Sequence, residues 1–226
     1  RIGPRTYETL CHYRGIEFGN WLFSKAAFRD RAPDAESRQL LATPEGADLC
    51  DELDLEADAL SRMRDKTAPD FIEYAMGVAD WSGVRVVGFT CTFQQTTASL
   101  ALARRLKERF PQIVTLFGGA NLESTMGREI VRAFPWIDFA IDGEADVAFP
   151  EFLSRIADGR SLDGMPGLIR RADSTRTTSP VAIDLNTLPV PDYSEFFSRA
   201  AAMAIIHTDE VSTVSLPVEG SRGCWW

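Results

Sequence analysis

The chain has 226 residues, of which 45% are hydrophobic, enough for one large domain or two small ones around a sizeable core. Its formal net charge is −9 at pH 7, which argues against a nucleic-acid partner, because nucleic-acid-binding proteins carry basic patches. No apolar run approaches the roughly 20 residues of a membrane-spanning helix, and no signal-peptide core follows Arg1. We therefore expect neither nucleic acid nor a membrane as a partner.

Cysteine and histidine usage favours a reduced compartment and gives little support to a zinc site. The chain has four cysteines and two histidines: Cys11, Cys50, Cys91, Cys224, His12 and His207. The cysteines lie far apart with no Cys-x-x-Cys pair, and a chain this long needs no disulfide staples, so a cytoplasmic location fits best. Two distant histidines do not favour a self-contained zinc site.

The first 80 residues have the spacing of several amphipathic helices. Leu49, Leu53 and Leu60 recur along one such helix. Thr67 is placed to cap the next helix, with Pro69 in its first turn. We therefore predict an N-terminal helical subdomain over residues 1–80.

Residues 84–146 predict a parallel sheet. Val84–Phe89, Ile113–Phe117 and Ile137–Ile141 are short apolar runs without strict alternation, as expected of strands that are buried on both faces. Helical spacing separates them, at Ala98–Phe110 and Met126–Phe134. This order of strands and helices predicts an α/β fold, a doubly wound Rossmann- or flavodoxin-like sheet.

The remaining chain predicts a third helix and then an extended linker. Phe149–Ile156 has helical spacing and Gly159 ends it, and Gly167–Arg170 has the character of a further strand. Leu188–Asp192 carries two prolines and is linker-like, and Val211–Val218 has the character of a strand. We predict a sheet domain over residues 81–175 and a linker region over residues 176–226.

Unusual small and polar residues follow the three predicted parallel strands. The loops are Thr90–Thr97, Gly118–Asn121 and Asp142–Asp146. Because a ligand of such a sheet lies beyond the carboxyl ends of its strands, we expect the three loops to converge on one site. Small and hydroxyl side chains there let a large ligand approach the backbone and offer it hydrogen bonds.

This pattern resembles the cobalamin-binding domain that precedes the catalytic barrel in cobalamin-dependent radical S-adenosylmethionine enzymes. The segments that carry the resemblance are Gly88-Phe89-Thr90, Gly118-Gly119-Ala120-Asn121, Asp142-Gly143-Glu144-Ala145 and Ser221-Arg222-Gly223-Cys224. The helical segment and residues 191–194 are most similar to the branch of C-methyltransferases that modify ribosomally made peptides. The resemblance covers nearly the whole chain.

The resemblance implies a set of cofactors and partners. Cobalamin would bind at the strand ends, and the intact enzyme would also use a [4Fe–4S] cluster, S-adenosylmethionine and a peptide substrate. Cys224 would be the first of three cluster ligands in a Cys-x-x-x-Cys-x-x-Cys pattern, at the start of the barrel. The chain would then be a fragment of a probable methyltransferase and inactive by itself. It would supply the place where cobalamin sits, because the cofactor does the difficult chemistry.

Two departures from related domains qualify the resemblance. Methionine-synthase-like domains carry an Asp-x-His-x-x-Gly motif whose histidine binds cobalt, but this chain has no histidine between His12 and His207. A binding mode without a histidine ligand is therefore implied. The sheet of the family also begins with a strand before the helical segment, so we expect this sheet to lack one strand.

The candidate cofactor-binding residues are Thr90, Cys91, Thr92, Gln94, Gln95, Gly118, Gly119, Ala120, Asn121, Gly143 and Glu144, and the candidate metal ligand is Cys224. Most of them have a structural alternative. Thr90, Thr92, Gln94, Gln95 and Glu144 could cap helices, Cys91 could be a small buried hydrophobe, and Gly118 and Gly119 could serve a tight turn. If a ligand lies against the backbone here, a side chain at Gly118 or Gly119 should obstruct binding more than folding.

Other functions remain open on the sequence alone. A flavodoxin-like regulatory or interaction module without cofactor is the main alternative. A hydrolase is disfavoured, because the chain has no Gly-x-Ser-x-Gly elbow. Asp142 and Glu144 are poor candidates for a catalytic carboxylate pair, because no acid–base partner is evident.

Overall fold

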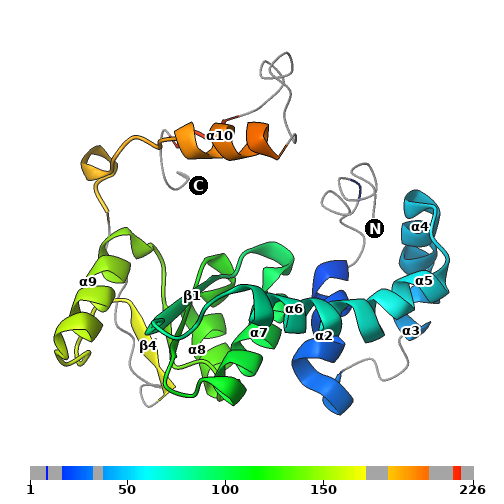
Figure 1. The fold of residues 1–226 in the computed structure, drawn as a ribbon, viewed down its shortest axis with the longest axis horizontal. Coiled ribbons are helices and arrows are strands. Elements are labelled where there is room, and N and C mark those ends of the chain that lie inside the picture. The colour runs from blue at the N-terminus through cyan, green and yellow to red at the C-terminus, as the bar shows by residue number, and fades with distance from the viewer. Residues whose placement is uncertain (1–8, 10–16, 33–37, 172–182, 204–215, 220–226) are drawn as a thin grey trace. The chain divides into compact units, whose positions relative to one another are not determined.

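The computed structural model of the chain is drawn in Figure 1. It describes residues 9, 17–32, 38–171, 183–203 and 216–219. The chain forms two compact units, residues 1–181 and residues 182–226. The first unit contains the sheet.

The sheet has the strand order β1-β2-β3-β4 in the described part of the chain. The strands are β1 (Val86–Thr90), β2 (Val114–Gly118), β3 (Phe139–Ile141) and β4 (Leu168–Arg170). β1, β2 and β3 run parallel, and β4 pairs antiparallel with β3. The prediction of an α/β, Rossmann-like fold is confirmed. The strands lie within two residues of the predicted bounds, and the fourth strand makes the sheet mixed.

Helices cover both faces of this sheet. α7 (Thr96–Arg109) and α8 (Ser124–Ala133) pack on the face that carries Phe117. α9 (Ala145–Asp158) packs on the opposite face, where Leu116 contacts the same cluster as its buried side chains. Adjacent strand residues thus point into different cores, which explains why the strands are apolar without alternation.

The described part of the N-terminal segment is helical, as predicted. Its described elements are α2 (Phe18–Phe28), a 3₁₀ turn (Arg29–Arg31), α3 (Arg38–Leu41), α4 (Pro44–Leu53), α5 (Ala57–Arg62), a π-helical turn (Met63–Thr67) and α6 (Ala68–Val78). The prediction of one helix through Leu49, Leu53 and Leu60 is wrong, because α4 ends at Leu53 with Asp54 in the left-handed conformation and α5 begins at Ala57. α2 lies along α7, and Ala27 and Ile72 share a buried cluster with Leu100 of α7. The helical segment and the sheet therefore share one core.

The prediction that Thr67 begins a helix is wrong. Thr67 has helical backbone angles (φ −65°, ψ −40°) and its side chain caps nothing, because the π-helical turn joins α5 directly to α6. Pro69 explains this turn: in a regular α-helix its ring would clash with the carbonyl four residues earlier, and a wider turn relieves the clash.

The second unit contains a 3₁₀ turn (Leu185–Thr187) and α10 (Ser194–Ala202). α10 lies within the region that was predicted as a linker. The Asp192 carboxylate accepts the Ser194 amide hydrogen (2.8 Å). The strand predicted at Val211–Val218 lies mostly outside the described residues. Within the described part of the chain, no helix has both the length and the apolar character to span a membrane.

Candidate functional site

The three loops at the carboxyl ends of β1, β2 and β3 are joined to one another. The side-chain Nδ2 of Asn121 donates to the carbonyl of Phe93 (2.7 Å) and to the Thr96 hydroxyl (2.8 Å), which links the first two loops. The Ser124 amide donates to the Asp142 carboxylate (2.8 Å), which links the second loop to the third. The three loops therefore lie together at one edge of the sheet, as predicted, and a ligand bound there stays a prediction.

An uncovered glycine-lined surface lies beside these loops. Thr90 pairs in register with Gly118, so the two residues are neighbours on the same face of the sheet, and Thr90 is exposed. A Cβ atom at Gly118, or at Gly88 two residues before Thr90, would meet no atom within 4 Å. Nothing in the described chain therefore requires glycine at these two positions, and a flat ligand could lie against the strands there.

Gly119 has a different role from Gly118. Its φ is +98°, and a Cβ atom there would lie 2.7 Å from the carbonyl oxygen of Cys91. The Asn121 amide donates to the same carbonyl (3.1 Å). The chain itself therefore needs glycine at this position, and the expectation that a side chain at Gly119 would disturb binding more than folding is not supported.

Cys91 is fully buried in the core behind the loops. Its amide donates to the Gly118 carbonyl (2.7 Å), and burial raises the pKa of its thiol. A neutral thiol with no exposed surface behaves as a small hydrophobic side chain. This geometry favours the structural alternative for Cys91 over the ligand role.

The two glutamines of the first loop are used within the protein. Gln95 Oε1 accepts from the Thr92 amide (3.1 Å) and from the Thr92 hydroxyl (2.9 Å), which forms a reciprocal cap. Gln94 Oε1 accepts from the Gly19 amide (2.5 Å). Thr92, Gln94 and Gln95 thus shape the loop by contacts of their own.

Phe93 is a residue of the same loop that the sequence analysis missed. Its side chain is 89% exposed, and its φ of +47° is unusual for a residue with a bulky side chain. An aromatic side chain held outward in a sparsely populated conformation is a candidate ligand contact. The signal in the sequence was a single aromatic residue within an otherwise polar loop.

The third loop begins with a buried carboxylate. Asp142 is 7% exposed and holds the first turn of α8 through Ser124. Gly143 follows with a φ of +77°, and Glu144 precedes α9 without capping it through its side chain. Asp142 therefore supports the loops, and the capping alternative for Glu144 is not observed.

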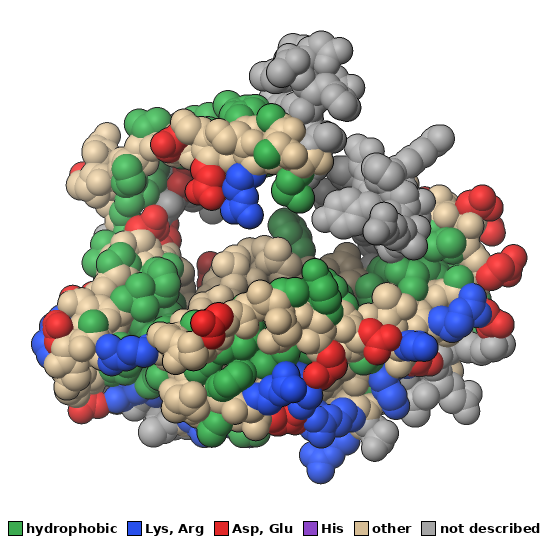
Figure 2. All heavy atoms as spheres, viewed as in Figure 1, with side chains coloured by type: hydrophobic (Ala, Val, Ile, Leu, Met, Phe, Trp, Pro, Cys, Tyr) green, Lys and Arg blue, Asp and Glu red, His purple; other side chains and the backbone are tan. Residues whose placement is uncertain are grey.

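The three loops contain no lysine or arginine. On the face drawn in Figure 2, basic side chains alternate with acidic ones and form no continuous basic surface. A site of this kind suits a ligand with many amide or hydroxyl groups better than a polyphosphate.

Known proteins are similar to parts of this chain, although no family model matches it. It is 26% identical over 98 residues to the cobalamin-dependent radical SAM methyltransferase TokK of Streptomyces tokunonensis, over 43% of this chain and 14% of that protein. It is 23% identical over 145 residues to an uncharacterized methyltransferase of Pyrococcus horikoshii, over 62% of this chain and 29% of that protein. It is 30% identical over 97 residues to the 2-(S-pantetheinyl)-carbapenam-3-carboxylate methyltransferase of Streptantibioticus cattleyicolor, over 42% and 14%.

These three relatives are methyltransferases. The similarity is partial, and the chain spans less than a third of the length of the curated relatives that it matches. One of them is cobalamin-dependent by name, which agrees with the family resemblance seen in the loop residues.

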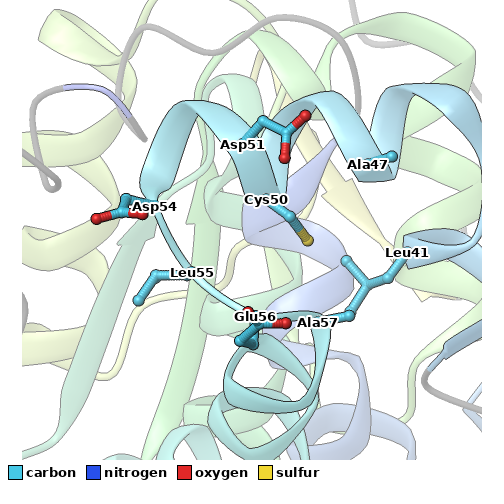
Figure 3. A pocket seen from close by; sticks show the side chains of 8 residues that line it. All are labelled: Leu41, Ala47, Cys50, Asp51, Asp54, Leu55, Glu56 and Ala57. Carbon is cyan, nitrogen blue, oxygen red and sulfur yellow. The ribbon is translucent and has the colours of Figure 1, made fainter.

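A separate pocket of about 410 Å³ lies in the helical segment (Figure 3). It is lined by Leu41, Ala47, Cys50, Asp51, Asp54, Leu55, Glu56 and Ala57. Burial raises the pKa of the Cys50 thiol, and the charges of Asp51 and Glu56 raise it further. The pocket includes no residue of the three loops.

Metal binding has no support among the described residues, where no group of three or more histidine, cysteine, aspartate or glutamate side chains is arranged to hold an ion. Cys224, the candidate cluster ligand, lies outside the described residues, as do His12 and His207.

Proposed function

We propose that this chain is the cobalamin-binding module of a methyltransferase-like radical S-adenosylmethionine enzyme. The observation that carries the proposal is the uncovered surface of Gly88, Thr90 and Gly118 beside three mutually linked loops. The corrin ring is large, flat and rich in amide side chains, so it requires an approachable backbone and neutral hydrogen-bonding groups. The similarity to a cobalamin-dependent methyltransferase supports the same ligand.

Each part of the surface has a role under this proposal. Gly88 and Gly118 leave room for the ligand against the strands, and Thr90 offers it a hydroxyl group. Phe93 supplies an exposed aromatic face. Gln95, Asn121 and Asp142 hold the loops in place. When bound, cobalamin would supply the methyl-transfer chemistry, and the chain would hold and orient it.

The alternative is a flavodoxin-like regulatory or interaction module without cofactor. A phosphate-bearing ligand, such as the flavin that gives this fold its name, fits the chain poorly. Flavin or nucleotide phosphates would need the open amino terminus of the first crossover helix. In α7, the Thr97 amide is already used by the side chain of Asn20 (3.2 Å), and the loops carry no basic residue. These features disfavour a phosphate ligand. The peptide substrate of the intact enzyme stays a prediction, since it rests on family resemblance alone.

Binding of hydroxocobalamin tests the proposal directly. The purified chain is mixed with hydroxocobalamin, desalted and examined by absorbance between 300 and 600 nm, roughly the range of corrin bands, since a ligand that dissociates slowly stays bound through desalting. We expect the corrin spectrum to elute with the protein. A heat-unfolded sample of the same chain controls for nonspecific adsorption. Elution of protein without corrin would contradict the proposal and favour the module without cofactor.

The bound cobalt should have no nitrogen ligand from this chain. Every histidine lies outside the described residues, and none follows the strand ends closely in the sequence. We expect the electron paramagnetic resonance spectrum of the Co(II) form to be the same for protein labelled with ¹⁵N and for unlabelled protein. Unlabelled cobalamin is used in both samples, so any splitting from the cofactor's own base stays constant. A change of splitting with the label would reveal a protein nitrogen on cobalt.

A further inference from the structure

The amino-terminal turn of α2 reaches the loop that follows β1. The Gly19 amide donates to Gln94 Oε1 (2.5 Å) across 75 residues of sequence. A Cβ atom at Gly19 would lie 2.9 Å from Gln94 Cβ and 3.2 Å from the Gln94 carbonyl oxygen. The loop therefore sits directly against the backbone of α2, and glycine allows this approach.

Asn20, the next residue of α2, caps α7 from outside that helix. Its Oδ1 accepts from the Thr97 hydroxyl (2.9 Å) and from the Thr97 amide (3.2 Å). The residue that directly precedes α7, Gln95, makes no side-chain cap there. Thr97 is only 7% exposed, so its amide depends on Asn20 for a hydrogen-bond partner. Asn20 Nδ2 in turn donates to Glu17 (2.7 Å), which orients the amide group.

We propose that Gly19 and Asn20 are positioning residues for the ligand loop of residues 91–97, so that the helical segment forms part of the ligand site. Gly19 contacts Gln94 in the middle of the loop, and Asn20 fixes Thr97 at its end. Phe93 directly precedes Gln94, so the contact with Gly19 restrains the backbone beside this exposed aromatic side chain. This inference rests on the proposed binding of cobalamin at the loop, and it adds a role for α2 in that binding.

Gly19→Ala tests the close approach. The added methyl group must displace Gln94, while alanine favours the helix, so the loop should move without general unfolding. We expect the dissociation constant for hydroxocobalamin to rise at least about tenfold, which equals roughly 1.4 kcal/mol. Gly77→Ala is the matched control, because it adds a methyl group to a helical glycine with no atom within 4 Å. That control should bind as the unmodified chain does.

Substitutions of Asn20 test its role as the cap of α7. Asn20→Leu removes the acceptor at similar size. Asn20→Asp retains an acceptor near the amino terminus of α7 and is combined with Glu17→Gln, because two carboxylates would otherwise repel each other where the Asn20 amide now donates to Glu17. We expect about tenfold weaker binding for Asn20→Leu, and affinity close to that of the unmodified chain for Asn20→Asp combined with Glu17→Gln. If Asn20 acted through packing alone, variants with and without the acceptor would weaken binding to the same extent.

Amide hydrogen exchange of residues 91–97, measured without ligand, separates this inference from the proposed function. Asn20→Leu should speed exchange of the Thr97 amide at least about tenfold, since its hydrogen bond is lost. If the unmodified chain binds no hydroxocobalamin, the proposed function fails, yet faster exchange would still show that α2 positions the loop. If exchange and binding in Gly19→Ala and Asn20→Leu both match those in Gly77→Ala, the inference is overturned.

Discussion

Gly119→Ala should lower the free energy of unfolding by about 3 kcal/mol or more. The backbone at Gly119 (φ +98°, ψ 171°) lies in a region that is essentially restricted to glycine, where a side chain costs about 1–3 kcal/mol. The new Cβ atom would also lie 2.7 Å from the Cys91 carbonyl oxygen and 3.0 Å from the Cys91 amide nitrogen. Both neighbours are backbone atoms, so relief requires one of the two loops to move. Urea denaturation at 25 °C measures the loss.

The neighbouring glycine provides the contrast. Gly118→Leu places a side chain into open space on a strand that has ordinary backbone angles. The free energy of unfolding should therefore change by less than about 1 kcal/mol. The same side chain would occupy the proposed ligand surface, and cobalamin retention should fall at least about tenfold, roughly 1.4 kcal/mol. Normal cobalamin binding by Gly118→Leu would remove this position from the site. A stable Gly119→Ala protein would show that the loops tolerate a shift.

The elements of the sheet could be predicted because their signals are local. Neighbouring residues alone define the apolar runs Val84–Phe89 and Ile113–Phe117 and the helical spacing between them. The strands and the helix of the structure closely match these predicted elements. The fold class then limits where the loops can meet. That step placed the loops Thr90–Thr97, Gly118–Asn121 and Asp142–Asp146 at one edge of the sheet before any contact was known.

The features that could not be predicted depend on residues far apart in sequence. Asn20 caps Thr97 across 77 residues, so no pattern of residues beside α7 indicates this cap. The π-helical turn before Pro69 depends on continued packing of both flanking helices, whereas the local pattern at Thr67 resembles an ordinary helix start. Gly118 and Gly119 look alike in sequence, and only the position of Cys91 separates their roles.

Gly127 does not stand out in the sequence, because a glycine within a helical pattern usually indicates only a locally low helix propensity. In α8 it lies against the loop after β2: a Cβ atom there would be 1.9 Å from the Leu122 carbonyl oxygen and 2.7 Å from the Leu122 carbonyl carbon. Leu122 itself is fully buried in the core. This close approach holds the second loop against the first turns of α8.

Gly127→Ala should therefore destabilise the chain by about 3 kcal/mol or more, although alanine is favoured over glycine within a helix by about 1 kcal/mol. Neither clashing atom can rotate away, since both belong to the backbone, and the Ile169 side chain (2.9 Å) blocks the adjacent space. Gly77→Ala is again the control, because the same change in α6 meets no atom and should stabilise the chain by up to about 1 kcal/mol. Urea denaturation of both variants isolates the packing at Gly127 from helix propensity. If the two variants unfold at the same urea concentration, the close contact between α8 and the second loop does not exist in solution.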